Sequence, residues 1–122
     1  MGPDPSADGR RSPPREPLPE PLVELTAKYL RILAKAKSIR LLEELSGGEA
    51  GVQELADRLG LTHQNASHHL QGLWREGIVA RRADGLTNLY AIEDWSAWWV
   101  IEQLTRSLGS GEADRNTQTP AE

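Results

Sequence analysis

The sequence predicts a mainly α-helical domain with a two-stranded β wing, arranged as a winged helix-turn-helix that dimerises. Two observations predict the winged helix-turn-helix. A short helical pattern over residues 52–59 is followed, after the tight corner Gly60-Leu61, by a second helical pattern over 62–76. The hydrophobic period then changes from helical to alternating over 78–92, as expected of a hairpin that forms a wing.

Composition places the compact part of the 122-residue chain at residues 22–108. Seven of the eight prolines lie between Pro3 and Pro21, in a polar segment that has almost nothing to bury. We therefore expect a disordered tail over 1–21, and a second one over the polar residues 109–122. The remaining length supports one modest core and excludes a large catalytic fold such as a (β/α)₈ barrel.

The absence of cysteine from the sequence excludes disulfides, thiolate metal sites and cysteine nucleophiles. No apolar run approaches the roughly 18 residues that a membrane span needs. The N-terminal segment also lacks the apolar centre of a signal peptide. We therefore expect a cytoplasmic protein that makes no contact with a membrane.

Apolar residues at helical spacing predict the flanking helices. The stripe that predicts a first helix over 22–36 consists of Leu25, Tyr29, Ile32, Leu33 and Ala36. We expect Ser38 to cap a second helix that ends at Gly47-Gly48. Asp94 is expected to cap a last helix over 94–108, which carries three tryptophans.

The helix-turn-helix and the wing have the clearest local signals. Thr62 is a good N-cap for the helix over 62–76. The inner face of that helix is predicted to be Ala66, Leu70, Leu73 and Trp74. The β-rich runs 78–82 and 87–92 lie on either side of Asp84-Gly85, a dipeptide typical of a hairpin turn.

The other face of helix 62–76 is polar and suits the groove of double-stranded DNA. Gln64 and Asn65 can pair bidentately with an adenine edge, and His68 can donate to a phosphate or a guanine. The alternative is an ordinary solvated face; the adjoining corner and wing favour groove contact, and we expect His69 to be structural. The predicted DNA-binding residues are Thr62, His63, Gln64, Asn65, Ser67, His68, Gln71, Arg81 and Arg82.

Charge is unevenly distributed along the chain. The net charge of −4 argues, by itself, against a nucleic-acid partner. Residues 58–90, however, hold four arginines and all three histidines against two acidic residues, so the local sign suits phosphate. Because side chains alternate along a strand, one of Arg81 and Arg82 is expected to reach a phosphate and the other to cover the hairpin.

The run Ser67-His68-His69-Leu70 resembles the helix-turn-helix of the ArsR/SmtB family of winged-helix repressors, as do Glu54-Leu55-Ala56 and Leu59-Gly60-Leu61 before it. Gly77-Ile78-Val79, followed by the hairpin, resembles the family's wing. The resemblance covers about residues 25–105. It implies transcriptional repression by a homodimer that pairs through its first and last helices.

Trp95, Trp98 and Trp99 are too large for one small core to cover fully. We favour a dimer seam formed with the first helix. The alternatives are an aromatic pocket for a small apolar effector, and a plain intramolecular core, which could absorb one of the three indoles. The residues predicted at the seam are Leu25, Tyr29, Ile32, Trp95, Trp98, Trp99 and Ile101.

The resemblance also implies two kinds of metal site, and the sequence departs from both. One family site uses a Cys-x-Cys pair where this chain has Gly51 and Gln53. The other uses carboxylates and histidines along the last helix, where Asp94 is followed only by Ser96, Ser107 and Ser110. Because a zinc site needs several converging ligands, we expect no metal and no cofactor. The sequence does not determine whether the protein has another effector or which one.

These features predict a sequence-specific, homodimeric DNA-binding regulator, and most simply a repressor. Helix 62–76 is expected to enter the major groove at each half of an inverted repeat, with wing 78–92 on the flanking backbone. The competing hypothesis is a winged-helix module that binds protein, which the net charge of −4 supports. No convergent acid, base and nucleophile is visible, so we do not expect an enzyme.

Overall fold

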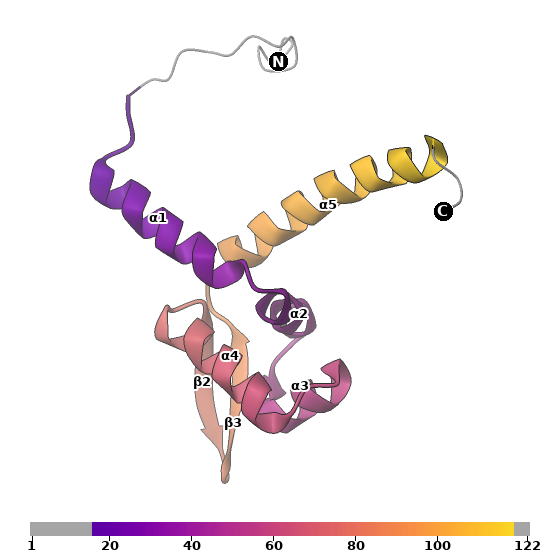
Figure 1. The fold of residues 1–122 in the computed structure, drawn as a ribbon. Helices are drawn as coiled ribbons and strands as arrows, with labels where there is room; N and C mark the ends of the chain where they lie inside the picture. The colour runs from indigo at the N-terminus through magenta and orange to yellow at the C-terminus, as the bar shows by residue number, and fades with distance from the viewer. Residues whose placement is uncertain (1–15, 119–122) are drawn as a thin grey trace.

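The computed structural model describes the backbone of residues 16–118 and the side chains of residues 16–110. The helices are α1 (Glu20–Leu33), α2 (Ala36–Leu45), α3 (Val52–Leu59), α4 (His63–Arg75) and α5 (Trp95–Gln118). The strands are β1 (Ala50–Gly51), β2 (Val79–Asp84) and β3 (Thr87–Ile92). Helices α2, α3 and α4 and the sheet form the body of the molecule, and α1 and α5 diverge from it as two arms (Figure 1). The fold is a winged helix-turn-helix, as predicted.

The core lies between the three body helices and the sheet. Its largest fully enclosed side chains are Tyr90, Leu41, Leu42, Leu45, Leu55, Leu70, Leu73, Ile78 and Val79. The predicted inner face of α4 is confirmed for Ala66, Leu70 and Leu73, all of which are completely buried. Each buried leucine side chain contributes roughly 1.5–3 kcal/mol through removal of its apolar surface from water.

Trp74 is 39% exposed, so the prediction that it lies on the inner face of α4 is wrong. The indole turns toward the wing, where the guanidinium of Arg81 lies over the ring at 3.6 Å from its centroid. A cation over an aromatic face is an attractive contact that keeps a large ring at the surface. Helical spacing alone could not separate this position from a core position.

The corner between α3 and α4 forms as predicted. Gly60 follows the last residue of α3 and adopts φ +68°, a left-handed conformation that a glycine tolerates at little cost. Thr62 then caps α4, since its Oγ1 accepts a hydrogen bond of 3.0 Å from the backbone N–H of Asn65. The glycine turn and the threonine cap together fix the orientation of α4 relative to α3.

The first two helices begin and end at different residues from those predicted. Helix α1 stops at Leu33, because Lys35 is extended at φ −121° and ψ 128° before α2 begins at Ala36. Lys35 is therefore the N-cap residue of α2. The prediction that Ser38 caps this helix is wrong, because Ser38 lies inside the first turn and is 2% exposed.

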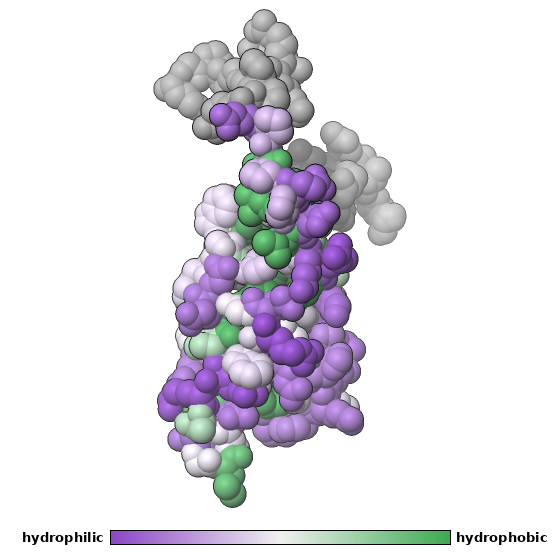
Figure 2. Space-filling view, turned by 90° about the vertical axis from the view of Figure 1, so that its left-hand side faces the viewer, coloured by the Kyte–Doolittle hydropathy of each residue, from purple (hydrophilic) through white to green (hydrophobic). Residues whose placement is uncertain are grey.

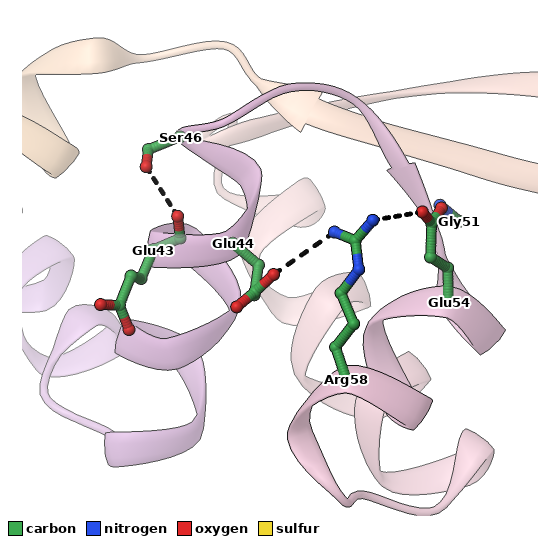
Figure 3. Close-up of polar contacts among 6 residues, drawn as sticks. All are labelled: Glu43, Glu44, Ser46, Gly51, Glu54 and Arg58. Carbon is green, nitrogen blue, oxygen red and sulfur yellow. Dashed lines mark hydrogen bonds and ion pairs between the residues drawn. The ribbon is translucent and has the colours of Figure 1, made fainter.

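Arg58 joins α3 to α2 on the side of the corner. Its guanidinium lies between Glu54 of its own helix and Glu44 of α2, at 3.3 Å from the Glu44 carboxylate (Figure 3). The carboxylate of Glu54 also accepts from the backbone N–H of Gly51 at 3.4 Å. All of these groups are partly exposed, so the network orients α3 more than it stabilises the fold.

The predicted hairpin is confirmed, and it has a third strand. Strands β2 and β3 pair antiparallel and close through Gly85 at φ +66°. Strand β1 pairs with β3 on its other side, so that the strand order is β1-β3-β2 and the two-stranded wing becomes a three-stranded sheet. A strand of two residues is too short to show the alternation that reveals a strand in a sequence.

Helix α5 continues to Gln118, beyond the predicted end at Leu108. The predicted disordered tail over 109–122 is therefore helical in its described part. No proline interrupts the chain between Pro21 and Pro120, so nothing in that part of the backbone forces the helix to stop. Most of the predicted N-terminal tail lies outside the described residues. Across the part of the chain that the structure describes, every helix is too short or too polar to span a membrane.

Candidate nucleic-acid interface

The outer face of α4 carries a ridge of exposed polar side chains opposite its buried face. Its members are Gln64, His68, Gln71 and Arg75. They lie along one side of a straight helix of 13 residues, which is the shape that fits a major groove. Three of the four, Gln64, His68 and Gln71, were predicted to bind DNA; the fourth, Arg75, lies exposed on the same ridge.

Between this ridge and the wing lies a groove of about 190 Å³, formed by α3, α4 and β3. His63 and Ser67, both predicted to contact DNA, line it together with the Leu86–Asn88 segment of the hairpin. The ring Nδ1 of His63 lies 2.9 Å from Oε1 of Gln53, and the Gln71 amide donates to Ser67 Oγ at 3.1 Å. The structure therefore brings three predicted residues of α4, His63, Ser67 and Gln71, together with the hairpin around one concave surface, which the predicted wing arginines do not line.

Two other predicted residues serve the helix itself. The hydroxyl oxygen of Thr62 accepts from the Asn65 N–H in the N-cap, and the Asn65 side chain is half-buried. Gln64 lies between them, is exposed, and makes no side-chain hydrogen bond to a described residue. Gln64 is therefore the side chain at this end of α4 that is available to a base edge.

The two wing arginines are held by partners within the chain. Arg82 donates through Nε and Nη2 to the two carboxylate oxygens of Glu49, at 2.7 and 2.8 Å. The hydrogen bond from Arg82 is the main cause that lowers the pKa of Glu49 below its usual value. Arg81 instead covers the Trp74 indole. Sequence reasoning missed Glu49, which precedes a strand too short to predict and lies 33 residues from its partner.

His69 lies on the flank of α4 that faces away from the wing, half-buried beside the start of α2. Burial is the main cause that lowers the pKa of its imidazole, and the nearby charges of His68, Lys35 and Lys37 lower it further. The His68 and His69 rings meet edge to face at 5.3 Å between centroids. Half-burial is in keeping with the structural role expected for His69.

The two arms leave apolar side chains uncovered. Trp95 is 53% exposed and Trp99 is 60% exposed. The other exposed apolar residues of the arms include Leu22, Val23, Leu25, Leu30, Val100, Leu104 and Leu108. Figure 2 shows apolar side chains gathered over the upper part of the molecule, above a more polar body. Exposed apolar surface of this extent typically marks an interaction site.

Not every residue predicted at the seam is exposed there. Ile101 is 6% exposed and belongs to the core of its own chain, so its assignment to a dimer seam is wrong. Tyr29, Ile32 and Trp98 are partly buried against the same core. Ile101 and Trp98 lie on the side of α5 that packs against the core, whereas Trp95 and Trp99 lie on its outer side. Which side of α5 faces inward depends on how the helix packs against α2.

Tyr29 and Asp94 connect the two arms. The Tyr29 hydroxyl donates to Oδ2 of Asp94, whose Oδ1 accepts from the backbone N–H of Ser96 at 3.0 Å and so caps α5 as predicted. The Ser96 hydroxyl and then Tyr29, both donating to the carboxylate, lower the pKa of Asp94. Burial, and then the Asp94 carboxylate, raise the pKa of Tyr29.

Among the described residues no three histidine, aspartate or glutamate side chains converge as metal ligands would. Both carboxylate oxygens of Asp94, the acidic residue singled out in the sequence, already accept hydrogen bonds. The described part of the chain therefore offers no group of side chains that fits a resident metal ion.

Comparisons with known proteins agree with this geometry. Residues 32–82 match a helix-turn-helix domain family. The chain is 35% identical to the HTH-type transcriptional regulator KmtR and 40% identical to the HTH-type transcriptional regulator Rv0081, both of Mycobacterium tuberculosis. These matches cover 65% and 60% of this chain, and the chain spans only 61% and 65% of the two relatives' lengths.

Solved structures extend the comparison to the arms. The crystal structure of Rv0081 superposes with a TM-score of 0.69 at 34% identity, covering 80% of this chain and 98% of that one. A homodimeric winged helix-turn-helix DNA-binding domain of Mycobacterium bovis, Mb0332, superposes with a TM-score of 0.67. At 22% identity, over 80% of this chain and 91% of that one, Mb0332 supports the fold alone.

Proposed function

Because this chain belongs to the ArsR/SmtB family of winged helix-turn-helix transcriptional regulators, we propose that it represses transcription as a homodimer bound to an inverted-repeat operator. One observation carries the proposal. The polar ridge of α4 stands clear of the body, capped at its start by Thr62 and braced from beneath by a fully buried apolar face. A helix held this rigidly can offer the same side chains to every site it meets.

The role of each α4 side chain in DNA binding follows from the contacts that it already makes within the protein. Gln64 and His68 are exposed and can reach base edges, whereas Ser67 and Gln71 first have to give up their mutual hydrogen bond. Arg81 and Arg82 lie on the wing strand beside the flanking backbone, where Arg81 contributes positive charge and Arg82 does so once it leaves Glu49. Base contacts from α4 specify the sequence, and the wing positions the domain.

Dimerisation is supported by the exposed apolar faces of α1 and α5. Two copies that pair through these faces remove Trp95, Trp99 and Leu25 from water and place two α4 helices on one side of the assembly. An inverted repeat with half-sites about one helical turn apart matches such a pair. Occupancy of this site by the dimer blocks the transcription machinery.

A small apolar effector is a second candidate element of the function, because α2 and α5 enclose a groove of about 400 Å³. Trp98, Ile39 and Ile101 provide its apolar wall, and Arg40 and Glu43 lie at its edge. Only one of the three indoles of α5 lines this groove, whereas two face outward. The seam therefore remains the main role of the indoles.

A mobility-shift experiment tests the function without knowledge of the operator. The protein should retard a random-sequence DNA duplex at low salt, and the retardation should disappear as the salt concentration rises. Binding to phosphates releases counterions from the DNA, so the affinity falls with increasing salt. Selection from a random pool should then enrich an inverted repeat. Failure to retard any duplex at low salt, together with recovery of a stable protein partner, would instead support the protein-binding module.

A further inference from the structure

The flank of α4 that faces away from the wing has a pocket of its own. It has a volume of about 190 Å³ and lies between α4 and the junction of α1 with α2. Its polar walls come from Lys35 and Ser38 at the start of α2 and from His69, Arg75 and Glu76 of α4 and its C-terminal end. Neither the wing groove nor the exposed apolar faces of the arms use this pocket.

The start of α2, whose residues Lys35 and Ser38 line this pocket, carries backbone donors that lack a capping partner. The N-cap residue Lys35 provides no side-chain hydrogen bond, and the first turn of the helix holds no acidic residue. The first intrahelical bond runs from the Ile39 N–H to the Lys35 carbonyl at 3.0 Å, which leaves the N–H groups of residues 36–38 without a helical partner. Helix α4, in contrast, has its Thr62 cap. Unpaired donors at the positive end of a helix dipole favour an anion.

Ser38 adds an independent sign of a ligand. The residue is almost wholly buried and lines the pocket, yet its hydroxyl makes no hydrogen bond to any described residue. In the described part of the chain, no fully enclosed side-chain oxygen or nitrogen lacks a partner. The Ser38 hydroxyl must therefore keep its remaining access through the pocket, where it can donate to a bound group.

Several positive side chains in or beside the pocket form no ion pair within the described residues. The arginines paired with glutamates are Arg40, Arg58, Arg82 and Arg106. Arg31, Lys35, Lys37 and Arg75 form no ion pair with any carboxylate in the described residues, and they lie in or beside the pocket. The acidic residue in its wall, Glu76, faces Lys28 at 3.9 Å. The pocket is therefore cationic overall.

The pocket also has the right position for a DNA strand. His68 and Arg75 belong both to the exposed ridge of α4 and to the pocket wall, so the pocket opens directly beside the ridge. A helix in the major groove, which is about 12 Å wide, has a phosphate backbone on each side. The wing groove lies on one flank of α4 and the cationic pocket on the other.

We propose that this pocket binds a backbone phosphodiester of the duplex, as a proposal that rests on the DNA-binding function. The N–H groups of residues 36–38 and the Ser38 hydroxyl donate to the non-bridging phosphate oxygens. Lys35 and Arg75 supply the balancing charge. The ligand chemistry is that of a tetrahedral oxyanion, and the pocket adds a second positioning point across α4 from the wing.

The test is the salt dependence of binding to a short random-sequence duplex, followed by fluorescence anisotropy. Lys35→Gln should lower the slope of log affinity against log salt by about 0.9, which corresponds to about an eightfold loss at about 0.1 M salt relative to 1 M. Ser38→Ala removes a neutral donor, so affinity should fall a few-fold with an unchanged slope. Arg40→Gln removes the same charge from the same helix on the other side and should leave both quantities unchanged. Thermal unfolding of each variant verifies that it is folded.

The outcomes separate the two proposals. No binding by the unaltered protein overturns the DNA-binding function itself. Binding with equal slopes for Lys35→Gln and Arg40→Gln overturns the phosphate pocket and leaves the function standing. Titration of the free protein with inorganic phosphate, followed by the amide resonances of residues 36–38, distinguishes the source of the oxyanion. Saturable shifts together with equal DNA slopes would identify a free-anion site and contradict the proposal.

Discussion

The body and the two arms of this protein treat apolar side chains in opposite ways. In the body, leucines from α2, α3 and α4 close around Tyr90 with no exposed surface. In the arms, by contrast, α1 and α5 carry several large apolar side chains that are more than half exposed, namely Leu25, Trp95, Trp99, Leu104 and Leu108. The body is therefore complete as a platform for α4, whereas the arms are complete only when another surface covers them. Stability and assembly should respond to different substitutions.

The largest effect is expected from the body. Leu70→Ala removes a fully buried side chain of α4 and should destabilise the fold by about 2–5 kcal/mol, because it leaves a cavity in a closed core. Leu30→Ala, on the exposed face of α1, is the matched substitution in an arm. Denaturant unfolding at low protein concentration should show little change for Leu30→Ala. Equal losses would mean that the arms are packed as tightly as the body.

Assembly should fail first in the arms. Trp99→Glu places a charge in the proposed seam, where burial without a partner costs several kcal/mol, so the mass in light scattering should fall from twice the chain mass to the chain mass. Leu86→Glu, at the exposed tip of the hairpin, is the control and should keep the doubled mass. A monomeric parent protein would contradict the seam and the palindromic operator with it.

The contact that links the arms should contribute less. Tyr29→Phe removes the hydrogen bond to Asp94 and should cost about 1 kcal/mol at neutral pH. Because the folded-state pKa of Asp94 is lowered, its contribution exists above the unfolded pKa and disappears as pH falls through the folded value. The difference between the two proteins in chemical unfolding should therefore shrink in strong acid. A difference that is independent of pH would show that Tyr29 acts through packing alone.

The smallest effect is expected at the wing. Glu49→Gln neutralises the carboxylate that holds Arg82 and should free this guanidinium to contact a phosphate. Affinity for a random-sequence duplex should rise a few-fold. The slope of log affinity against log salt should become steeper by up to about 0.9, the value for one added phosphate contact. The neighbouring Glu43→Gln, which pairs with Arg40 on α2, serves as the control. An unchanged slope for Glu49→Gln would indicate that Arg82 points away from the bound backbone.

Local signals predicted the parts of the fold that local interactions determine. Gly60, Thr62 and the Asp84-Gly85 turn act over a few residues, and α3, the start of α4 and the hairpin have the predicted places. The candidate site could be predicted as far as the exposed face of α4. These features need no knowledge of how distant segments meet.

Distant contacts account for what the sequence could not predict. The orientation of Trp74 depends on Arg81 across the α4–wing junction, and the partner of Arg82 is Glu49, 33 residues away. Ile101 faces inward only because α5 packs on α2. The pocket beside α2 depends on the chain breaking at Ala34–Lys35, where apolar periodicity continues in the sequence without a visible stop.

The central claim is that side chains on the ridge of α4 recognise DNA bases. A substitution of Gln64 tests this claim most directly, because the exposed Gln64 side chain makes no hydrogen bond that supports the fold. On a duplex selected by the parent protein, Gln64→Ala should weaken binding by about 1–3 kcal/mol and flatten the preference at one or two base pairs. The fold should be unchanged, since Gln64 packs against nothing in the core. Fluorescence anisotropy on the selected duplex and on single-base variants measures both quantities. If Gln64→Ala and Ser67→Ala both keep full affinity and full base preference, α4 is not the reading helix.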